Sequence, residues 1–358
     1  MAPAAILNQK EIPIVFSPIH GASGKMVPEA LRKFGFENIH IVKEQAEPDG
    51  NFPTVIYPNP EEPEALDLSL KLAAQVNAEL VLACDPDGDR YASAIPNEFG
   101  EYELLNGNQT GSIIIYYLLN RWQEQGRLTG NQFTVSTIVT TDLIEKIAEG
   151  FHVTHFSTLT GFKFIASVIL EQEGKMQFIA GGEESYGFLV GDFARDKDGV
   201  SACAILAEIV AFYKERGMTL FDVLAEIYGQ YGFYKESLIS VTKKGKDGAE
   251  QILQLMHRFR SNPPEAINGV KVTKIVDVKE SKIYDKLNGN IEPLTLEKSN
   301  VIQFYLEDGS KISARPSGTE PKIKYYISVC ENLPNREGYR AVEASLDKKI
   351  TELKKFFG

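Results

Sequence analysis

The stretch ELVLACDPDGDR, residues 79–90, joins an apolar run to an acidic turn. The run LVLAC is short, mostly aliphatic and without polar alternation, which is typical of a strand buried on both faces. The turn that follows carries three aspartates, one proline and one glycine, and proline and glycine end regular structure. A strand buried on both faces needs helices on either side, so this segment predicts an α/β fold.

Helix-like and strand-like segments alternate around this stretch. Upstream, residues 12–19 and 38–42 are strand-like, whereas residues 28–36 and 63–78 are helix-like. A second series of the same kind follows residue 105, and in it an apolar run again ends in an acidic loop, GEESYG at 182–187. The alternation predicts right-handed βαβ connections and a mainly parallel sheet in each series.

The pattern changes near residue 228. Several strand-like runs follow, some separated by hairpin-like turns such as EDGSK at 307–311, and they lie between two helix-like segments. The predicted architecture is α/β, with two consecutive βαβ-type domains that have mainly parallel mixed sheets, followed by a C-terminal α+β domain with an antiparallel sheet. The predicted boundaries are residues 1–105, 106–228 and 229–358.

The composition limits the possible partners and location. There are 38 Lys plus Arg against 49 Asp plus Glu, a net charge of −11 that argues against nucleic-acid and acidic-membrane partners. No run approaches the roughly 18 apolar residues of a membrane span, and the first residues do not resemble a secretory signal. Cys84, Cys203 and Cys330 lie far apart in apolar runs. They predict buried thiols in a reducing, cytoplasmic location.

The turn at residues 85–90 offers carboxylates at alternate positions, Asp85, Asp87 and Asp89. A tight turn can direct all three toward one hard cation, and Mg²⁺ prefers oxygen ligands of this kind. An EF-hand loop would need glycine at its sixth position and glutamate at its twelfth, but these are Arg90 and Pro96. A solvated acidic turn without a metal is the alternative interpretation.

Two further loops combine groups suited to sugars and phosphates. The GEESYG loop places Glu183 and Ser185 between glycines, which suits hydrogen bonding to vicinal hydroxyls, although such loops are common. The segment RPSGTEPKIK, residues 315–324, offers a guanidinium, two hydroxyls, glycine and lysines that can surround a phosphate, and a plain hairpin turn is the alternative. The HGASGKM segment at 20–26 does not match the P-loop pattern GxxxxGK[ST].

These motifs together resemble the α-D-phosphohexomutases, within them the phosphoglucomutase/phosphopentomutase branch. The matching segments are DPDGDR, TGFKF, GEESYG, ARDKDG and RPSGTEP, in the family's order, with the branch's long loop QAEPDGNFPTVIYPNPEEPEAL at 45–66. The resemblance covers essentially the whole chain, from the family's second domain through its fourth.

The resemblance implies roles for individual residues. The metal ligands would be Asp85, Asp87 and Asp89, with Arg90 and Lys163 as catalytic residues; Arg90 would contact phosphate, and Lys163 would bind phosphate or donate a proton. The substrate-binding residues would be Glu183, Ser185, Lys197, Arg315, Ser317, Gly318 and Thr319. Snorkelling of Lys163 along an amphipathic helix and an exposed charged turn around Lys197 are the alternative interpretations.

One departure from the family is clear. The resemblance implies a phosphorylatable serine in a loop of the Thr-Ala-Ser-His-Asn-Pro type, and these 358 residues contain no Ser-His pair. The sequence therefore predicts an incomplete form that lacks the serine-bearing N-terminal domain and is inactive alone.

The implied reaction is the interconversion of glucose 1-phosphate and glucose 6-phosphate, with Mg²⁺ as cofactor and glucose 1,6-bisphosphate as intermediate and activator. Phosphorylated sugars are the expected partners, together with the missing domain. Phosphopentomutase or phosphomannomutase activity, or phosphosugar binding without turnover, are the alternatives.

Overall fold

Strand β3 (Leu80–Cys84) lies at the centre of a five-stranded sheet with the order β2-β1-β3-β4-β5. It pairs in parallel with β1 (Ile14–Ser17), which in turn pairs in parallel with β2 (Ile39–Ile41). On its other side β3 pairs antiparallel with β4 (Tyr91–Pro96), and β4 with β5 (Tyr102–Leu105). The mixed sheet predicted for this part of the chain is therefore present, with two parallel and two antiparallel pairings rather than a mainly parallel one.

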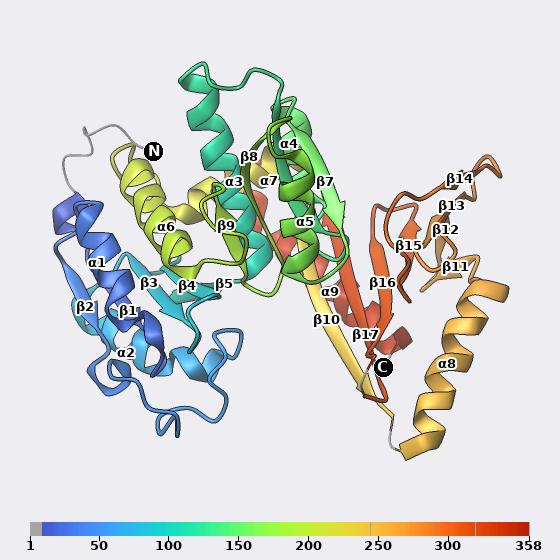
Figure 1. Ribbon diagram of the computed structural model, residues 1–358, viewed down its shortest axis with the longest axis horizontal. Helices are drawn as coiled ribbons and strands as arrows, with labels where there is room; N and C mark the ends of the chain where they lie inside the picture. Colours follow the sequence, from blue (N-terminus) through green and yellow to red (C-terminus); the bar gives the residue numbers. More distant parts are fainter. Residues whose placement is uncertain (1–8, 244, 319, 358) are drawn as a thin grey trace. The chain divides into compact units, whose positions relative to one another are not determined.

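The computed structural model describes residues 9–243, 245–318 and 320–357. The chain divides into two units, Met1–Ile227 and Tyr228–Gly358 (Figure 1). The first unit contains two sheets and the second contains one.

Helices cover both faces of the first sheet. Strand side chains alternate between the faces, so Val81 packs with Ala73 of α2 (Asp67–Val76) on one side, whereas Cys84 faces Cys203 of α6 (Gly199–Lys214) on the other. Helix α1 (Met26–Lys33) packs against α6. Short 3₁₀ helices are η1 (Gln9–Glu11), η2 (Ala22–Gly24), η3 (Lys43–Gln45) and η4 (Pro63–Leu66). This layering explains why LVLAC needs no polar positions.

The second sheet repeats the arrangement of the first with the order β7-β6-β8-β9. Its elements are α3 (Gly107–Glu124), β6 (Gln132–Thr137), α4 (Leu143–Gly150), β7 (Thr154–Thr158), α5 (Phe162–Gln172), β8 (Gln177–Gly182) and β9 (Phe188–Val190). Strands β7, β6 and β8 are parallel, and β9 returns antiparallel. The loops β3–β4 and β8–β9 therefore occupy equivalent positions in the two sheets.

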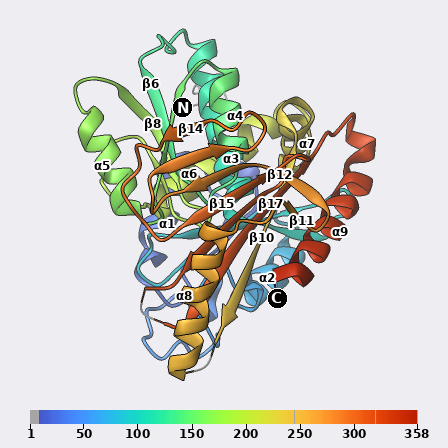
Figure 2. The ribbon, with the colours of Figure 1, turned by 90° about the vertical axis from the view of Figure 1, so that its right-hand side faces the viewer.

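The second unit is an antiparallel sheet with the order β10-β17-β16-β15-β12-β13-β14, and β11 pairs with β12 (Figure 2). Its elements are β10 (Phe233–Thr242), α8 (Gly245–Ser261), β11 (Ala266–Ile267), β12 (Val270–Asp277), β13 (Lys282–Asp285), β14 (Ile291–Pro293), β15 (Ile302–Leu306), β16 (Lys311–Pro316), β17 (Lys322–Glu331), η5 (Arg336–Gly338) and α9 (Tyr339–Phe357). The predicted α+β organisation with an antiparallel sheet is confirmed.

Strand register places both helices of this unit on one face of the sheet. Phe259 of α8 contacts Phe304, and Phe357 of α9 contacts Tyr325. Through the pairs Phe304–Ile312 and Ile312–Ile327, Phe304 shares a face with the odd-numbered residues of β17, including Tyr325. Even-numbered residues of β17 lie on the opposite face.

Some elements were not predicted from the sequence. The sequence patterns did not predict helix α7 (Leu220–Tyr231) or the short strands β4, β5, β9, β11, β13 and β14. The predicted boundary at residue 105 falls where β5 ends and α3 begins, and the boundaries themselves stay predictions. Within the described residues no helix has both the length and the apolar character that crossing a membrane requires.

Candidate active site

The β3–β4 loop gathers the three predicted metal ligands. Asp85 is buried, Asp89 is half-buried and Asp87 is exposed, and each offers a carboxylate oxygen within 4.8 Å of the others. Burial raises the pKa of Asp85, and the charge of Asp87 adds to this effect, whereas the bonds from Arg90 oppose it. Three clustered carboxylates are hard oxygen donors, so this set fits Mg²⁺.

Glycines outside the loop make room for it. A Cβ atom on Gly21 would lie less than 3.0 Å from the backbone of Pro86, and the amide of Ala22 donates to the Pro86 carbonyl over 2.8 Å. On the other side, the Gly199 amide donates to the Gly88 carbonyl over 3.1 Å at the start of α6. The loop is therefore held between the HGASG segment and the ARDKDG segment.

Arg90 closes the turn and links it to a second segment. Its backbone amide donates to Asp85 Oδ1 over 2.9 Å, and its Nε donates to Asp85 Oδ2 over 2.7 Å. Its Nη1 donates to Asn59 Oδ1 over 3.2 Å and to Glu61 Oε1 over 3.0 Å. Asn59 and Glu61 belong to the Pro-rich loop, residues 52–65, so this loop contacts the predicted metal loop through one guanidinium.

The β8–β9 loop lies directly beside the metal loop. Arg90 and Gly187 form an isolated antiparallel bridge, and the Tyr91 amide donates to the Tyr186 carbonyl over 3.1 Å. Glu183 is buried, and its Oε1 accepts a hydrogen bond from the Gly161 amide over 2.7 Å. The two predicted loops thus come together at the carboxyl ends of β3 and β8, where ligands of α/β proteins usually bind.

Lys197 joins the two loops electrostatically. Its Nζ lies 2.7 Å from Asp89 Oδ2, and its side chain passes so close to Gly187 that a Cβ atom there would clash. Burial lowers the pKa of Lys197, but the hydrogen bond and charge of Asp89 outweigh that effect and raise the pKa. Lys197 therefore stays cationic beside the carboxylates.

Lys163 and Ser185 are less constrained by the fold. Lys163 is exposed in the first turn of α5, and its ammonium lies 4.8 Å from the centre of the Phe164 ring. Ser185 is half-buried in the β8–β9 loop. Gly161, whose amide donates to Glu183, precedes Lys163 by two positions, so the backbone of Lys163 lies next to the site.

Several residues of the site had no signal in the sequence analysis. Glu184 Oε2 accepts hydrogen bonds from Thr137 Oγ1 over 3.2 Å and from Thr140 Oγ1 over 3.4 Å, which ties the β8–β9 loop to the end of β6. Burial, followed by the charge of Glu183, raises the pKa of Glu184. Tyr186 packs into the apolar cluster of the first sheet and has φ +66°. These contacts fix the shape of the loop rather than offering groups to a ligand.

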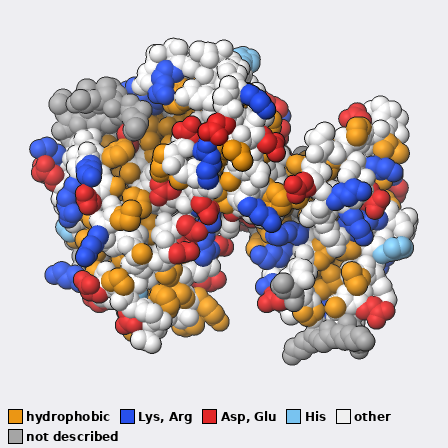
Figure 3. All heavy atoms as spheres, viewed as in Figure 1, with side chains coloured by type: hydrophobic (Ala, Val, Ile, Leu, Met, Phe, Trp, Pro, Cys, Tyr) orange, Lys and Arg blue, Asp and Glu red, His pale blue; other side chains and the backbone are white. Residues whose placement is uncertain are grey.

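The predicted phosphate loop is the β16–β17 hairpin of the second unit. Arg315 pairs across the strands with Lys324, so both side chains lie on the sheet face opposite α8 and α9, together with Lys322. The Ser317 amide donates to the Lys322 carbonyl over 2.8 Å, and Gly318 is exposed. Thr319 lies outside the described residues. Figure 3 shows Lys and Arg side chains in groups on the second unit, in the face turned to the viewer.

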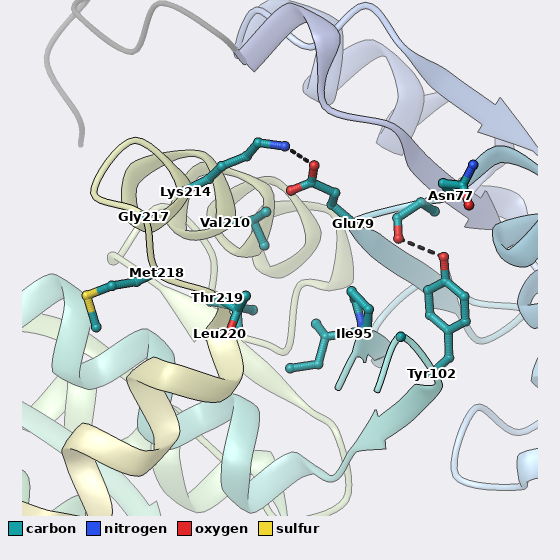
Figure 4. A pocket seen from close by; sticks show the side chains of 13 residues that line it. Asn77, Glu79, Ile95, Tyr102, Val210, Lys214, Gly217, Met218, Thr219 and Leu220 are labelled. Atoms are coloured by element: carbon teal, nitrogen blue, oxygen red, sulfur yellow. Dashed lines mark hydrogen bonds and ion pairs between the residues drawn. The ribbon is translucent and has the colours of Figure 1, made fainter. Parts of the chain in front are cut away.

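A cavity of about 440 Å³ lies near the opposite end of β3 (Figure 4). Lys214 and Glu79 form an ion pair in its wall, and the Tyr102 hydroxyl donates to the Ala78 carbonyl over 2.8 Å. Its other walls are mostly apolar, and of the predicted site residues that the structure describes, none lines it. The cavity is thus separate from the loops described above.

Comparisons with known proteins bear on this arrangement. Two models of one family match the chain: phosphoglucomutase/phosphomannomutase alpha/beta/alpha domain II over residues 4–98, and alpha/beta/alpha domain III over residues 106–231. The chain belongs to the phosphoglucomutase/phosphomannomutase family. These are the α-D-phosphohexomutases that the motifs resemble, so that resemblance is confirmed. The matched regions contain the β3–β4 loop and the β8–β9 loop respectively.

Curated relatives are phosphoglucomutases. The protein of Staphylococcus aureus strain bovine RF122 / ET3-1 is 37% identical over 327 residues, which are 91% of this chain and 58% of the relative. The protein of strain MRSA252 is 37% identical over 323 residues, 90% of this chain and 58% of the relative. The chain therefore spans less than two thirds of the length of these relatives.

Solved structures show the same fold. Parafusin of Paramecium, a phosphoglucomutase in an open form, matches with a TM-score of 0.64 at 18% identity and covers 98% of this chain and 58% of that one. A phosphoglucomutase/phosphomannomutase family protein of Burkholderia thailandensis matches with a TM-score of 0.60 at 17% identity, covering 96% and 60%.

Proposed function

We propose that these residues form the Mg²⁺- and phosphosugar-binding part of a phosphoglucomutase. The longer protein would interconvert glucose 1-phosphate and glucose 6-phosphate, with glucose 1,6-bisphosphate as the intermediate. The observation that carries the proposal is the junction of two loops, in which three carboxylate oxygens within 4.8 Å lie beside Arg90, Lys197 and the Glu183 loop.

The metal site would be formed by Asp85, Asp87 and Asp89. A bound Mg²⁺ would supply positive charge that stabilises a phosphoryl group during transfer. Arg90, paired with Asp85, would contact the phosphate, and Lys197, paired with Asp89, would add a second cation beside it. Such prearranged charge is the main catalytic contribution that a protein makes to phosphoryl transfer.

The sugar ring would lie against the β8–β9 loop. Glu183 and Ser185 can hydrogen-bond to vicinal hydroxyls, and Glu183 is already oriented because its Oε1 accepts from the Gly161 amide. Arg315, Ser317, Gly318 and Thr319 would bind the phosphate that does not react, through charge-assisted hydrogen bonds. Lys163 would bind phosphate or donate a proton.

Phosphoryl exchange also needs a nucleophile that accepts and returns the group. The resemblance assigns this task to a serine loop that these 358 residues do not contain. We therefore expect residues 1–358 to bind phosphosugars without turning them over. The 37% identity to phosphoglucomutases favours glucose phosphates over mannose or pentose phosphates.

Two assays on the 358-residue chain test the proposal. Calorimetric titration with glucose 1-phosphate should give binding that needs Mg²⁺, and glucose should bind much more weakly. A coupled assay for glucose 6-phosphate formation, with glucose 1,6-bisphosphate present, should give no turnover above that of the Asp87→Asn variant. Equal affinity for glucose and glucose 1-phosphate would refute phosphosugar binding, and robust turnover would show that another group is the nucleophile.

A further inference from the structure

The Pro-rich loop supplies an acidic partner to the phosphate-binding arginine proposed above. Glu61 Oε1 lies 3.0 Å from Arg90 Nη1, and the two side chains are 35% and 29% exposed. Asn59 Oδ1 accepts from the same Nη1 over 3.2 Å. These partners are separated from Arg90 by about thirty positions in the sequence, so only the fold brings them together.

The pattern of bonds on Arg90 limits how it can bind a phosphate. A guanidinium binds two oxygens of a phosphate through a pair of neighbouring donors. Nε already donates to the buried Asp85 over 2.7 Å, which fixes that edge of the guanidinium. Two-point binding must then use Nη1 and Nη2, and Nη1 is the nitrogen held by Glu61 and Asn59. A phosphate that binds this edge must take the place of an acceptor on Nη1, and the anionic Glu61 competes with it more strongly than the neutral Asn59.

The Pro-rich loop is anchored at both ends and presents the Glu61 side chain at the surface. At its start, Thr54 Oγ1 lies 2.9 Å from His20 Nε2 and accepts from Gln45 Nε2 over 3.0 Å. At its end, Ala65 is fully buried. Between these anchors Ile56 and Tyr57 are 77% and 64% exposed, and Glu61 is exposed although Pro60 before it is buried.

We propose that Glu61 occupies the phosphate-binding edge of Arg90 and competes for it with the phosphoryl group of the substrate. Because the phosphate must first displace the carboxylate from the guanidinium, Glu61 lowers the affinity of Arg90 for phosphorylated ligands. This inference rests on the proposed function, in which Arg90 binds phosphate.

The test is a double-mutant cycle on the 358-residue chain, in which calorimetry measures the affinity for glucose 1-phosphate in the presence of Mg²⁺. Glu61→Gln should tighten glucose 1-phosphate binding about two- to fivefold, the range expected from removing a competing, partly exposed ion pair. Glu62→Gln, which changes the neighbouring exposed carboxylate, is the matched control and should leave affinity unchanged. In an Arg90→Ala background, Glu61→Gln should have no effect.

The outcomes separate this inference from the proposed function. If Arg90→Ala leaves glucose 1-phosphate affinity unchanged, then Arg90 is not a phosphate ligand and both proposals are wrong for this residue. If Arg90→Ala weakens binding but Glu61→Gln weakens it too, or changes nothing, then the competition is absent and this inference alone is overturned. Tightening by Glu61→Gln that persists without Arg90 would overturn it as well, because a general change of charge would then be the cause.

Discussion

Gly21 lies against the backbone of Pro86, although the two residues belong to loops that are far apart in the sequence. A methyl group on Gly21 would come within 3.0 Å of the Pro86 backbone, and Gly21 itself has an ordinary negative φ of −102°. Glycine is therefore required at this position because a side chain would not fit, and not because the backbone conformation is unusual. Because Pro86 lies between Asp85 and Asp87, the contact fixes the position of the loop that carries the carboxylates.

We expect Gly21→Ala to destabilise the first unit and to weaken Mg²⁺ binding. Overfilling a packed position costs about 1–3 kcal/mol, and here backbone atoms would have to move. Urea unfolding followed by the fluorescence of Trp122, the single tryptophan, gives the free energy of unfolding. Gly50→Ala is the matched control, since an added Cβ there meets nothing within 4 Å. Equal stability of the two variants would show that the loop adapts freely.

Asp87→Asn should weaken Mg²⁺ binding by about an order of magnitude or more, because it removes one of three charged oxygen donors. The fold should be intact, since Asp87 is exposed. Calorimetric titration with Mg²⁺ measures the effect, and Asp192→Asn, at an exposed aspartate outside the loop, is the control. A metal affinity equal to that of wild type would remove Asp87 from the ligand set.

Arg315→Ala should weaken glucose 6-phosphate binding about 10- to 150-fold, because a charge-assisted hydrogen bond contributes roughly 1.5–3 kcal/mol. Glucose binding should hardly change. Arg258→Ala, at an exposed arginine of α8 in the same unit, is the control for a general loss of charge. Equal weakening of glucose and glucose 6-phosphate binding would mean that Arg315 has a structural role.

The Glu184 carboxyl should make the free energy of unfolding depend on pH. Burial raises its folded-state pKa above the unfolded value of about 4.3, so its stabilising contribution is complete below that value and is lost as pH rises. Glu184→Gln cannot ionise and keeps an oxygen for Thr137 and Thr140. The stability of wild type relative to Glu184→Gln, measured by urea unfolding, should therefore fall as the pH rises above the unfolded-state pKa. A difference that does not change with pH would contradict this assignment.

The sequence predicted the elements whose patterns are local. The run LVLAC and the acidic turn after it follow from composition alone, and both occur where expected as β3 and its loop. The sequence KIKYYISVC of β17 also alternates between two kinds of side chain. Its odd-numbered residues, which pack under the helices, are all apolar or aromatic, and its even-numbered residues lie on the other face of the sheet. Local order of this kind does not depend on the rest of the chain.

Helix α7 was missed although Asp222, Glu226 and Gln230 recur every four residues and form a partly exposed polar face. A second signal was present at its start, where the Thr219 and Asp222 side chains bind each other's backbone amides in the manner of a capping box. Asn59 and Glu61 could not be assigned from the sequence, since their contact with Arg90 depends on the path of the Pro-rich loop. Contacts between distant segments require the fold.

A crystal structure of the 358-residue chain grown with Mn²⁺ and glucose 6-phosphate tests the central claim most directly. Mn²⁺ stands in for Mg²⁺ and is located by its anomalous scattering. We predict one peak at about 2.0–2.2 Å from an oxygen of each of Asp85, Asp87 and Asp89, with sugar hydroxyls in hydrogen-bond range of Glu183 and Ser185. A metal peak elsewhere, or a sugar bound away from the β8–β9 loop, would contradict the account.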